Sequence, residues 1–268
     1  LIMGIGMVLN SVMNGPGTVL KSVMARRAVS LDEKERQFLN VVSEMSIAAG
    51  IPAPTAYIIP DPDLNAFAAG FSYNNSCVAI TEGLLKELNR EELQAVIGHE
   101  ISHIRNYDMR LMTVVAALIG AVGLISDFAR RAMRFKGTSS SGGRRKGGAG
   151  IAILILFFVW VLFILLAPLL SRILAMAISR QREYLADASS AELTRNPLTL
   201  VSALEKIRNA ISPTYAVNNG VAHMCITDPR GSLIEEKLGF AADLFATHPP
   251  MEKRILALKV MAYQKGGV

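Results

Sequence analysis

One long stretch without a charged side chain restricts what this chain can fold into. It runs from Gly150 to Ser171 and reads GIAILILFFVWVLFILLAPLLS. A helix rising about 1.5 Å per residue would cross roughly 30 Å of bilayer hydrocarbon over this length. Composition agrees, since 51% of the residues are hydrophobic and the mean hydropathy is +0.35, which is unusual for a soluble domain. The run predicts a transmembrane helix.

Two further apolar runs are shorter or interrupted. Leu111 to Ser126 is rich in Ala, Gly and Val, and is either a thin span or a helix buried against protein. Leu1 to Leu20 is expected to be an N-terminal transmembrane helix, and the initial Leu indicates that upstream sequence is missing. A signal peptide is disfavoured, because no basic segment precedes this run and no Ala-x-Ala site follows it.

The positive charge of the chain is explained by membrane attachment better than by nucleic acid. The net charge is +6 and the pI is near 9.4. The basic residues lie beside the apolar runs, where such charges flank membrane segments: Lys21, Arg26, Arg27, those within 130–146, Arg172, Arg180 and Arg182. No nucleic-acid partner is expected. Cys77 and Cys225 form no CxxC motif and fit free thiols in a reducing compartment.

The polar parts of the chain predict a mainly helical domain with a small sheet. Ser30 to Glu33 resembles a capping box that opens a helix ending at Gly50. Short β-branched and apolar segments between turn residues predict three strands, at 56–59, 65–69 and 77–81. Helices are expected at 81–88, 89–106 and 172–193, the second of them capped by Asn89.

The second of these helices carries the motif His99-Glu100-Ile101-Ser102-His103. Residues four apart share one helix face, so His99 and His103 can direct two imidazoles at one metal ion. Glu100 follows the first histidine and is placed to take a proton from an attacking water that the metal activates. With only four histidines in the chain, a chance match of this pattern is rare. The motif predicts a zinc hydrolase with Glu100 as the catalytic base.

A catalytic zinc site needs a third protein ligand, and a carboxylate is the natural candidate because no histidine follows at short spacing. Glu183 and Asp187 lie four residues apart on the helix expected after the apolar run. Glu183 could bind the metal, and Asp187 could accept a hydrogen bond from a ligand histidine. Spacing alone equally allows both acids to pair with Arg180 or Arg182 on a solvated face.

Four segments together resemble the HtpX family of membrane zinc metallopeptidases. They are HEISHIRNYD (99–108), REYLAD (182–187), NPLTLVSALEKI (196–207) and THPPMEKRI (247–255), in that order. The resemblance extends from about Arg26 onward. It implies a zincin-like fold in which His99, His103 and Glu183 bind one zinc ion per chain and Glu100 is catalytic.

The resemblance also assigns weaker roles to two other segments. Asn65-Ala66-Phe67-Ala68 aligns with the family's NAFA segment, along which an extended substrate lies. His248, in Thr247-His248-Pro249, resembles a histidine that stabilises the oxyanion of the tetrahedral intermediate. Without the resemblance the first would be a turn asparagine opening a strand and the second a loop histidine. Arg254 is expected to brace this loop by pairing with an acid that the sequence does not identify.

The expected fold class is α+β, a mainly helical zincin-like metalloprotease domain with a small β-sheet and transmembrane helices. Four parts are expected: the N-terminal helix (1–20), a first catalytic part with the metal-binding helix (21–110), the apolar pair (111–171) and a second catalytic part with the third ligand (172–268). The apolar pair encloses a basic loop rich in Gly and Ser (128–149).

Because the ligands on the two helices must meet, either both apolar runs cross the membrane or neither does. Basic residues after the first and last runs favour a cytoplasmic catalytic side, although a double crossing would place the basic loop on the opposite side, against the positive-inside rule. A shallow hairpin that never crosses would remove this conflict. The resemblance implies a location in the bacterial inner membrane.

The function expected from these residues is peptide hydrolysis by water, assisted by zinc and Glu100. The resemblance implies an endopeptidase in membrane protein quality control and stress response, with misfolded or damaged membrane proteins as substrates and the lipid bilayer as a partner. A CAAX-type processing peptidase is the alternative within enzymes, but this chain has few apolar segments to enclose a chamber. A membrane scaffold with a structural zinc site is the alternative outside enzymes.

Overall fold

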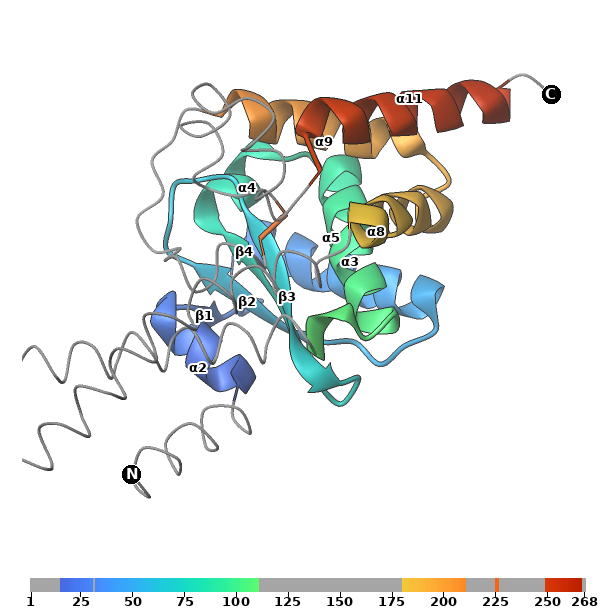
Figure 1. The fold of residues 1–268 in the computed structure, drawn as a ribbon. Coiled ribbons are helices and arrows are strands. Elements are labelled where there is room, and N and C mark those ends of the chain that lie inside the picture. Colours follow the sequence, from blue (N-terminus) through green and yellow to red (C-terminus); the bar gives the residue numbers. More distant parts are fainter. Residues whose placement is uncertain (1–14, 31, 111–179, 211–224, 227–248, 267–268) are drawn as a thin grey trace, which may run out of the picture.

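The computed structural model describes residues 15–30, 32–110, 180–210, 225–226 and 249–266. A four-stranded sheet in the order β1-β2-β4-β3 lies at its centre (Figure 1). The parallel pair β2–β4 is flanked by antiparallel neighbours. The strands are β1 (Arg26–Arg27), β2 (Thr55–Ile59), β3 (Ala66–Ser72) and β4 (Asn75–Thr81).

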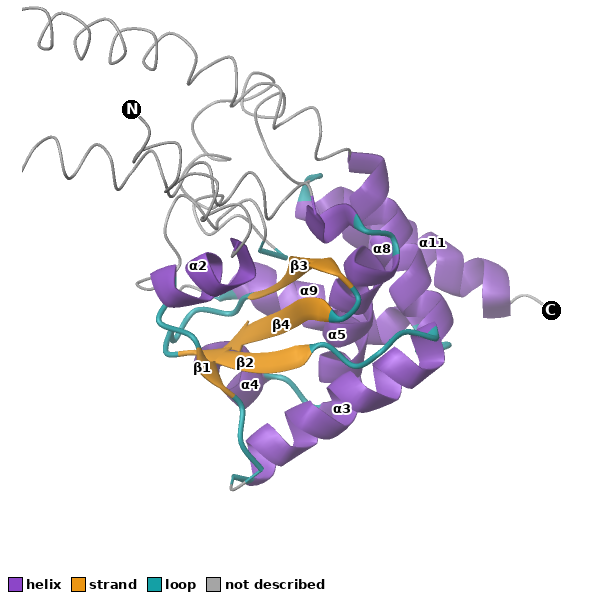
Figure 2. Ribbon diagram, turned by 90° about the horizontal axis from the view of Figure 1, so that it is seen from below, coloured by secondary structure: helices purple, strands orange, loops and turns teal. Residues whose placement is uncertain are grey.

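Helices make up most of the described chain, and several lie side by side along the sheet (Figure 2). Their bounds are α2 (Gly15–Ser22), α3 (Glu33–Ala49), α4 (Glu82–Glu87), α5 (Arg90–Arg105), α8 (Arg180–Leu193), α9 (Pro197–Asn209) and α11 (Met251–Gly266). The prediction of a mainly helical domain with a small sheet is thus confirmed. The sequence missed β1, whose two arginines pair with Ile58 and Tyr57 of β2.

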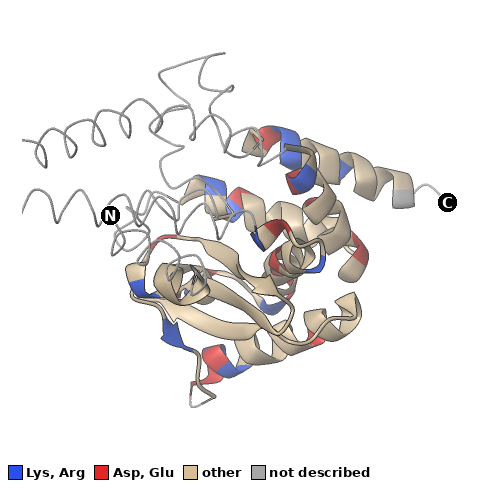
Figure 3. Ribbon diagram, turned by 60° about the horizontal axis from the view of Figure 1, so that its bottom comes forward, with Lys and Arg blue, Asp and Glu red and all other residues tan. Residues whose placement is uncertain are grey.

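Alternation along the strands buries both faces of the sheet. Residues such as Ala68 and Ile80 pack with α3 and α5 in the larger core. Their neighbours in sequence, such as Phe67 and Ala79, pack with α2 in a second cluster on the opposite face. Successive side chains of a strand point to opposite faces, so each buried strand serves both clusters. Figure 3 shows β2, β3 and β4 without charged residues.

Caps fix where the helices begin. The expected capping box at Ser30 is wrong, because α3 begins at Glu33 and Asp32 is its N-cap, accepting the N–H of Glu35. At α5 the side chain of Asn89 accepts the N–H of Glu92, and the Glu92 carboxylate accepts the N–H of Asn89 in return. The predicted Asn89 cap is therefore confirmed as a full capping box, which sets the register of the helix that carries His99.

A glycine lets the two helices of the site approach closely. A methyl group at Gly98 of α5 would lie 3.2 Å from Oγ of Ser190 on α8. The Ser190 hydroxyl donates a 2.5 Å hydrogen bond to the carbonyl of Ala95, one turn before His99. Such small-residue contacts permit helix axes to come near each other. The contact holds α8 against the helix that carries both motif histidines.

The expected membrane segments lie mainly outside the described residues, which omit 1–14 and 111–179. Within the described ranges, no helix has both the length and the apolar character needed to cross a membrane. The end of the first apolar run forms α2, where Val19 and Leu20 are buried against the sheet.

Candidate metal centre

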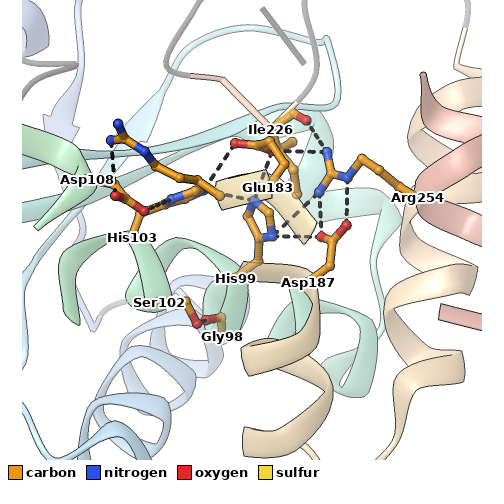
Figure 4. A network of polar contacts seen from close by, with 10 residues as sticks. Gly98, His99, Ser102, His103, Asp108, Glu183, Asp187, Ile226 and Arg254 are labelled. Atoms are coloured by element: carbon orange, nitrogen blue, oxygen red, sulfur yellow. Dashed lines mark hydrogen bonds and ion pairs between the residues drawn. The ribbon is translucent and has the colours of Figure 1, made fainter. Parts of the chain in front are cut away.

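Three donor side chains from two helices converge at one buried point (Figure 4). His99 and His103 of α5 direct their Nε2 atoms together, 3.2 Å apart. Glu183 of α8 lies with Oε1 3.5 Å from Nε2 of His103 and Oε2 3.7 Å from Nε2 of His99. All three are buried, and their donor atoms lie within 4.8 Å of one another. The sequence had named these three residues as metal ligands.

Each histidine has a carboxylate on its other ring nitrogen. Nδ1 of His99 lies 2.9 Å from Oδ1 of Asp187, and Nδ1 of His103 lies 3.3 Å from Oδ2 of Asp108. A carboxylate can only accept, so Nδ1 of each ring carries a hydrogen, and a neutral ring then directs the Nε2 lone pair to the shared point. The sequence suggested Asp187 for this position and missed Asp108, which follows the end of α5.

Arg254 of α11 holds Asp187 in place. Its Nε and Nη2 donate to the two carboxylate oxygens of Asp187 at 2.8 and 2.6 Å, and its Nη1 donates to the Ile226 carbonyl at 2.9 Å. Nη1 also lies 3.4 Å from Oε2 of Glu183. Burial alone would raise the pKa of Asp187, but the charge and hydrogen bonds of Arg254, with the bond from His99, lower it to about 2. Asp187 is thus the acid that pairs with Arg254.

Glu100 lies beside the three donors and is 1% exposed. The N–H of Ala68 on β3 is hydrogen-bonded to its carboxylate, while its Oε2 has no hydrogen-bond partner among the described residues. Burial raises the pKa of Glu100 to about 7, assisted by the charge of Glu183 and opposed by those of His103 and Arg254. A carboxyl group with a pKa near neutral pH is suited to exchange protons there.

The two histidines differ in proton affinity. Burial lowers the pKa of His99 despite its bond with Asp187, so this ring stays neutral. Burial also acts to lower the pKa of His103, but the hydrogen bond with Asp108 and the charges of Glu183 and Glu100 raise it to about 9. In the absence of metal, the His103 ring is therefore positively charged at neutral pH, with a hydrogen on both nitrogens.

The segment expected to contact substrate lies at the beginning of β3, which is an edge strand. Asn65 to Ala68 are all buried. Cys225 forms an antiparallel bridge with Phe67, and the N–H of Ile226 donates to the carbonyl of Ala66 at 2.9 Å. Part of the outer edge is thus paired with the chain's own backbone, which the sequence gave no means to predict. His248 lies outside the described residues.

The site can now be compared with known proteins. The family model for peptidase family M48 matches residues 32–262. A protein of Streptococcus equi subsp. zooepidemicus described as "Protease HtpX homolog" is 49% identical over 84% of this chain and 73% of its own length. One from Streptococcus pyogenes serotype M49, described in the same words, is 45% identical over 96% of this chain and 84% of its own. The chain belongs to the HtpX family of M48 peptidases. It is therefore a metallopeptidase.

Among solved structures, this M48 peptidase resembles the crystal structure of S. mikatae Ste24p, with a TM-score of 0.55. The sequence identity is 16%, and the match covers 96% of this chain and 57% of that one. At this identity the likeness concerns the fold. It supports the overall fold of this chain.

The residues present fit a divalent metal ion. Two imidazole nitrogens and a carboxylate form the ligand set common in catalytic zinc sites. The buried Oε2 of Glu100 has no hydrogen-bond partner in the described part of the chain, and it is the kind of polar atom that a bound water or substrate would satisfy.

A pH dependence follows for the metal-free M48 peptidase. The pKa of His103 is raised to about 9 in the fold from an ordinary value of 6.5, so its contribution to stability is full below about pH 6.5 and is lost as pH rises through about 9. The pKa of Glu100 is raised to about 7 from 4.5, so its contribution to the stability of the fold is also lost as pH rises through 7. We expect the thermal unfolding midpoint of chelator-treated protein to decrease as the pH is raised from 6.5 to 9. Thermal unfolding in detergent measures it, and a midpoint that rises over this window contradicts the assignment.

Proposed function

We propose that this chain is a membrane-bound zinc endopeptidase in which His99, His103 and Glu183 hold the metal and Glu100 is the catalytic base. The observation that carries the proposal is the convergence of both Nε2 atoms and the Glu183 carboxylate (Figure 4). The buried Glu100 interacts electrostatically with His103 and Glu183 of this group. The membership of the chain in a metallopeptidase family supports a role of this arrangement in peptide hydrolysis.

Zinc is the metal we propose, with one ion per chain, because the ligand set of two histidines and one carboxylate is typical of catalytic zinc. The ion would supply Lewis acidity that activates a water molecule and polarises the peptide carbonyl. Asp187 orients the His99 imidazole, and Arg254 orients Asp187. A ligand set held by such partners keeps its geometry through turnover.

Glu100 would take a proton from the attacking water and later deliver it to the leaving amine. Its burial supports this double role, because desolvation disfavours the charged carboxylate and so favours holding the proton between the two transfers. His248, by resemblance to its family motif, would donate a hydrogen bond to the oxyanion together with backbone N–H groups.

The substrate would lie as an extended strand along the outer edge of β3, at Asn65 to Ala68. The bridge between Phe67 and Cys225 supports this, since it is a backbone pairing at that edge. Ala68 also directs its N–H to Glu100, so a strand there would bring a peptide bond next to the base. Pairing at Ala66 requires the substrate to displace the N–H of Ile226. Main-chain pairing makes little sequence demand, which implies broad specificity.

The membrane role is proposed on the apolar runs and the family. We propose attachment to the bacterial inner membrane through 1–20 and the pair in 111–171, with the catalytic domain, formed by 21–110 and 172–268, on the cytoplasmic side. Unfolded or damaged membrane proteins are the proposed substrates, in quality control.

Metal removal tests the proposed function. Protein in detergent is expected to contain one zinc ion per chain and to cleave an unfolded membrane protein. A chelator should abolish cleavage, and one equivalent of Zn²⁺ should restore it, because the activated water depends on the metal. Zinc content by elemental analysis and product bands are the measurements.

Two outcomes would favour the alternatives. A protein that holds zinc through four protein ligands and cleaves nothing would be a scaffold with a structural site. One that ignores unfolded membrane proteins and cleaves only prenylated C-terminal peptides would be a CAAX-type processing peptidase.

A further inference from the structure

The described residues include a second pair of charges that the proposed mechanism has not used. Asp108, 9% exposed, lies 3.3 Å from Nδ1 of His103 and accepts from Nη1 of Arg182 at 3.2 Å. Arg182 immediately precedes Glu183 on α8. The Arg182 guanidinium on α8 therefore contacts Asp108. Asp108 in turn contacts His103, the proposed ligand on α5.

A specific backbone turn brings Asp108 under His103. The helix α5 ends at Arg105, and Tyr107 has a φ of 60°, in the left-handed region that residues other than glycine rarely adopt. This turn interrupts the helix, and Asp108, five positions after His103, contacts its ring. A continuing helix would have carried the same carboxylate away from it.

The surroundings of Tyr107 hold this turn in place. Its ring stacks on Tyr73 of the β3–β4 hairpin, with centroids 4.7 Å apart, and the guanidinium of Arg110 lies 4.0 Å from its centroid on a face. The Tyr73 hydroxyl donates to the carbonyl of Arg105 at 3.0 Å, which ties the hairpin to the end of α5. Uncommon backbone conformations of this kind persist only where the surroundings determine them, and they gather at functional sites.

From this geometry we infer that Asp108, braced by Arg182, is a positioning residue for the metal site. It holds the hydrogen of His103 on Nδ1, so that the Nε2 lone pair faces His99 and Glu183. Arg182 fixes the carboxylate and links it to the backbone next to Glu183. The inference rests on the proposed function, since it assigns these residues a task only if His103 binds the metal.

The pair forms the counterpart of Asp187 and Arg254 on the other histidine. It is more exposed, because the Arg182 side chain is 35% accessible to solvent whereas that of Arg254 is 1%. Solvent screens the more exposed contact, so Asp108 should retain a part of its effect when Arg182 is removed.

Zinc affinity tests the inference without relying on cleavage. The dissociation constant for Zn²⁺ is measured by chelator competition on the full chain in detergent. We expect Asp108→Ala to raise it about 10- to 100-fold, Asp108→Asn less, and Arg182→Gln less again. Adding Arg182→Gln to Asp108→Ala should weaken binding little further, because Arg182 acts through Asp108. Glu44→Ala is the matched control, since it removes the carboxylate partner of Arg90 at the far end of α5 and should leave zinc affinity unchanged.

Histidine tautomers provide the second measurement. The chain has four histidines, so ¹⁵N-histidine spectra are simple to assign with His103→Gln as reference. Zinc-loaded wild type should show the hydrogen of His103 on Nδ1. In Asp108→Ala, the ¹⁵N chemical shift of this Nδ1 should no longer be that of a hydrogen-bonded N–H. A general loss of folding would change the spectra of all the histidines and not of this ring alone. Asp108→Asn is the control for misfolding, because Asn has nearly the same shape as Asp.

The outcomes separate the two claims. If Asp108→Ala and Asp108→Asn bind zinc as tightly as wild type while His103→Gln binds it far more weakly, the positioning role of Asp108 is wrong and the metal site stands. If His103→Gln also keeps wild-type affinity, the proposed ligand set itself fails.

Discussion

Glu100→Gln is expected to abolish cleavage of an unfolded membrane protein while the protein keeps one zinc ion per chain. Gln has the size of Glu and can still accept the N–H of Ala68, but its amide cannot take a proton from water. The three proposed ligands are untouched. Loss of a general base that also serves as acid should lower kcat by about 10²- to 10⁴-fold. Initial rates with purified protein, beside zinc content, measure this.

A control on the same helix makes the result specific. Glu92 is buried at the start of α5, where it accepts from Ser202 and Lys206. Glu92→Gln should reduce stability and leave both zinc and turnover intact. Wild-type rates in Glu100→Gln would mean that another group is the base. Loss of zinc together with cleavage would instead make Glu100 a part of the metal-binding set.

Arg254→Met should produce the largest loss of stability of any single change at the site. It leaves the Asp187 carboxylate buried without its two guanidinium bonds and leaves the Ile226 carbonyl without its donor. Removing one partner of a buried ion pair costs about 3–5 kcal/mol. The loss should shrink as pH falls, because Asp187 without Arg254 becomes easier to protonate. Chemical denaturation in detergent at several pH values gives the free energy of unfolding.

A matched substitution on the same helix is Lys259→Met. Lys259 pairs with Glu205 at 2.8 Å, but both side chains are well exposed, and such a pair contributes about 0–1 kcal/mol. Combining Arg254→Met with Asp187→Leu should recover much of the lost stability, because the Asp187 charge is then removed together with its guanidinium partner. Equal effects of Arg254→Met and Lys259→Met would show that the buried pair does not hold the core together.

Local patterns in the sequence predicted much of this architecture. The four-residue spacing of His99 and His103 defined one helix face, and the acids at Glu183 and Asp187 repeated that spacing on a second helix. The structure brings these side chains together. Alternation and turn residues likewise predicted the three longer strands to within a few residues.

The parts that the sequence missed depend on contacts between distant segments. Arg254 is far from Asp187 in sequence, and no pattern in either segment names the other. Asp108 reaches His103 only because Tyr107 adopts a left-handed conformation, which its sequence type does not favour. The strand at Arg26 is two residues long and charged, so it lacks the apolar alternation by which strands are predicted.

The two carboxylate–arginine pairs around the histidines also determine how the centre balances its charge. Among the described residues, the acids Glu100, Glu183, Asp187 and Asp108 face two guanidinium groups, so neutral histidines leave two negative charges in excess. A divalent cation cancels this excess, whereas a monovalent one cancels only half. Without metal, protons on His103 and Glu100, with pKa values of about 9 and about 7, supply the missing positive charge. Metal loading at the proposed site would then exchange protons for a cation.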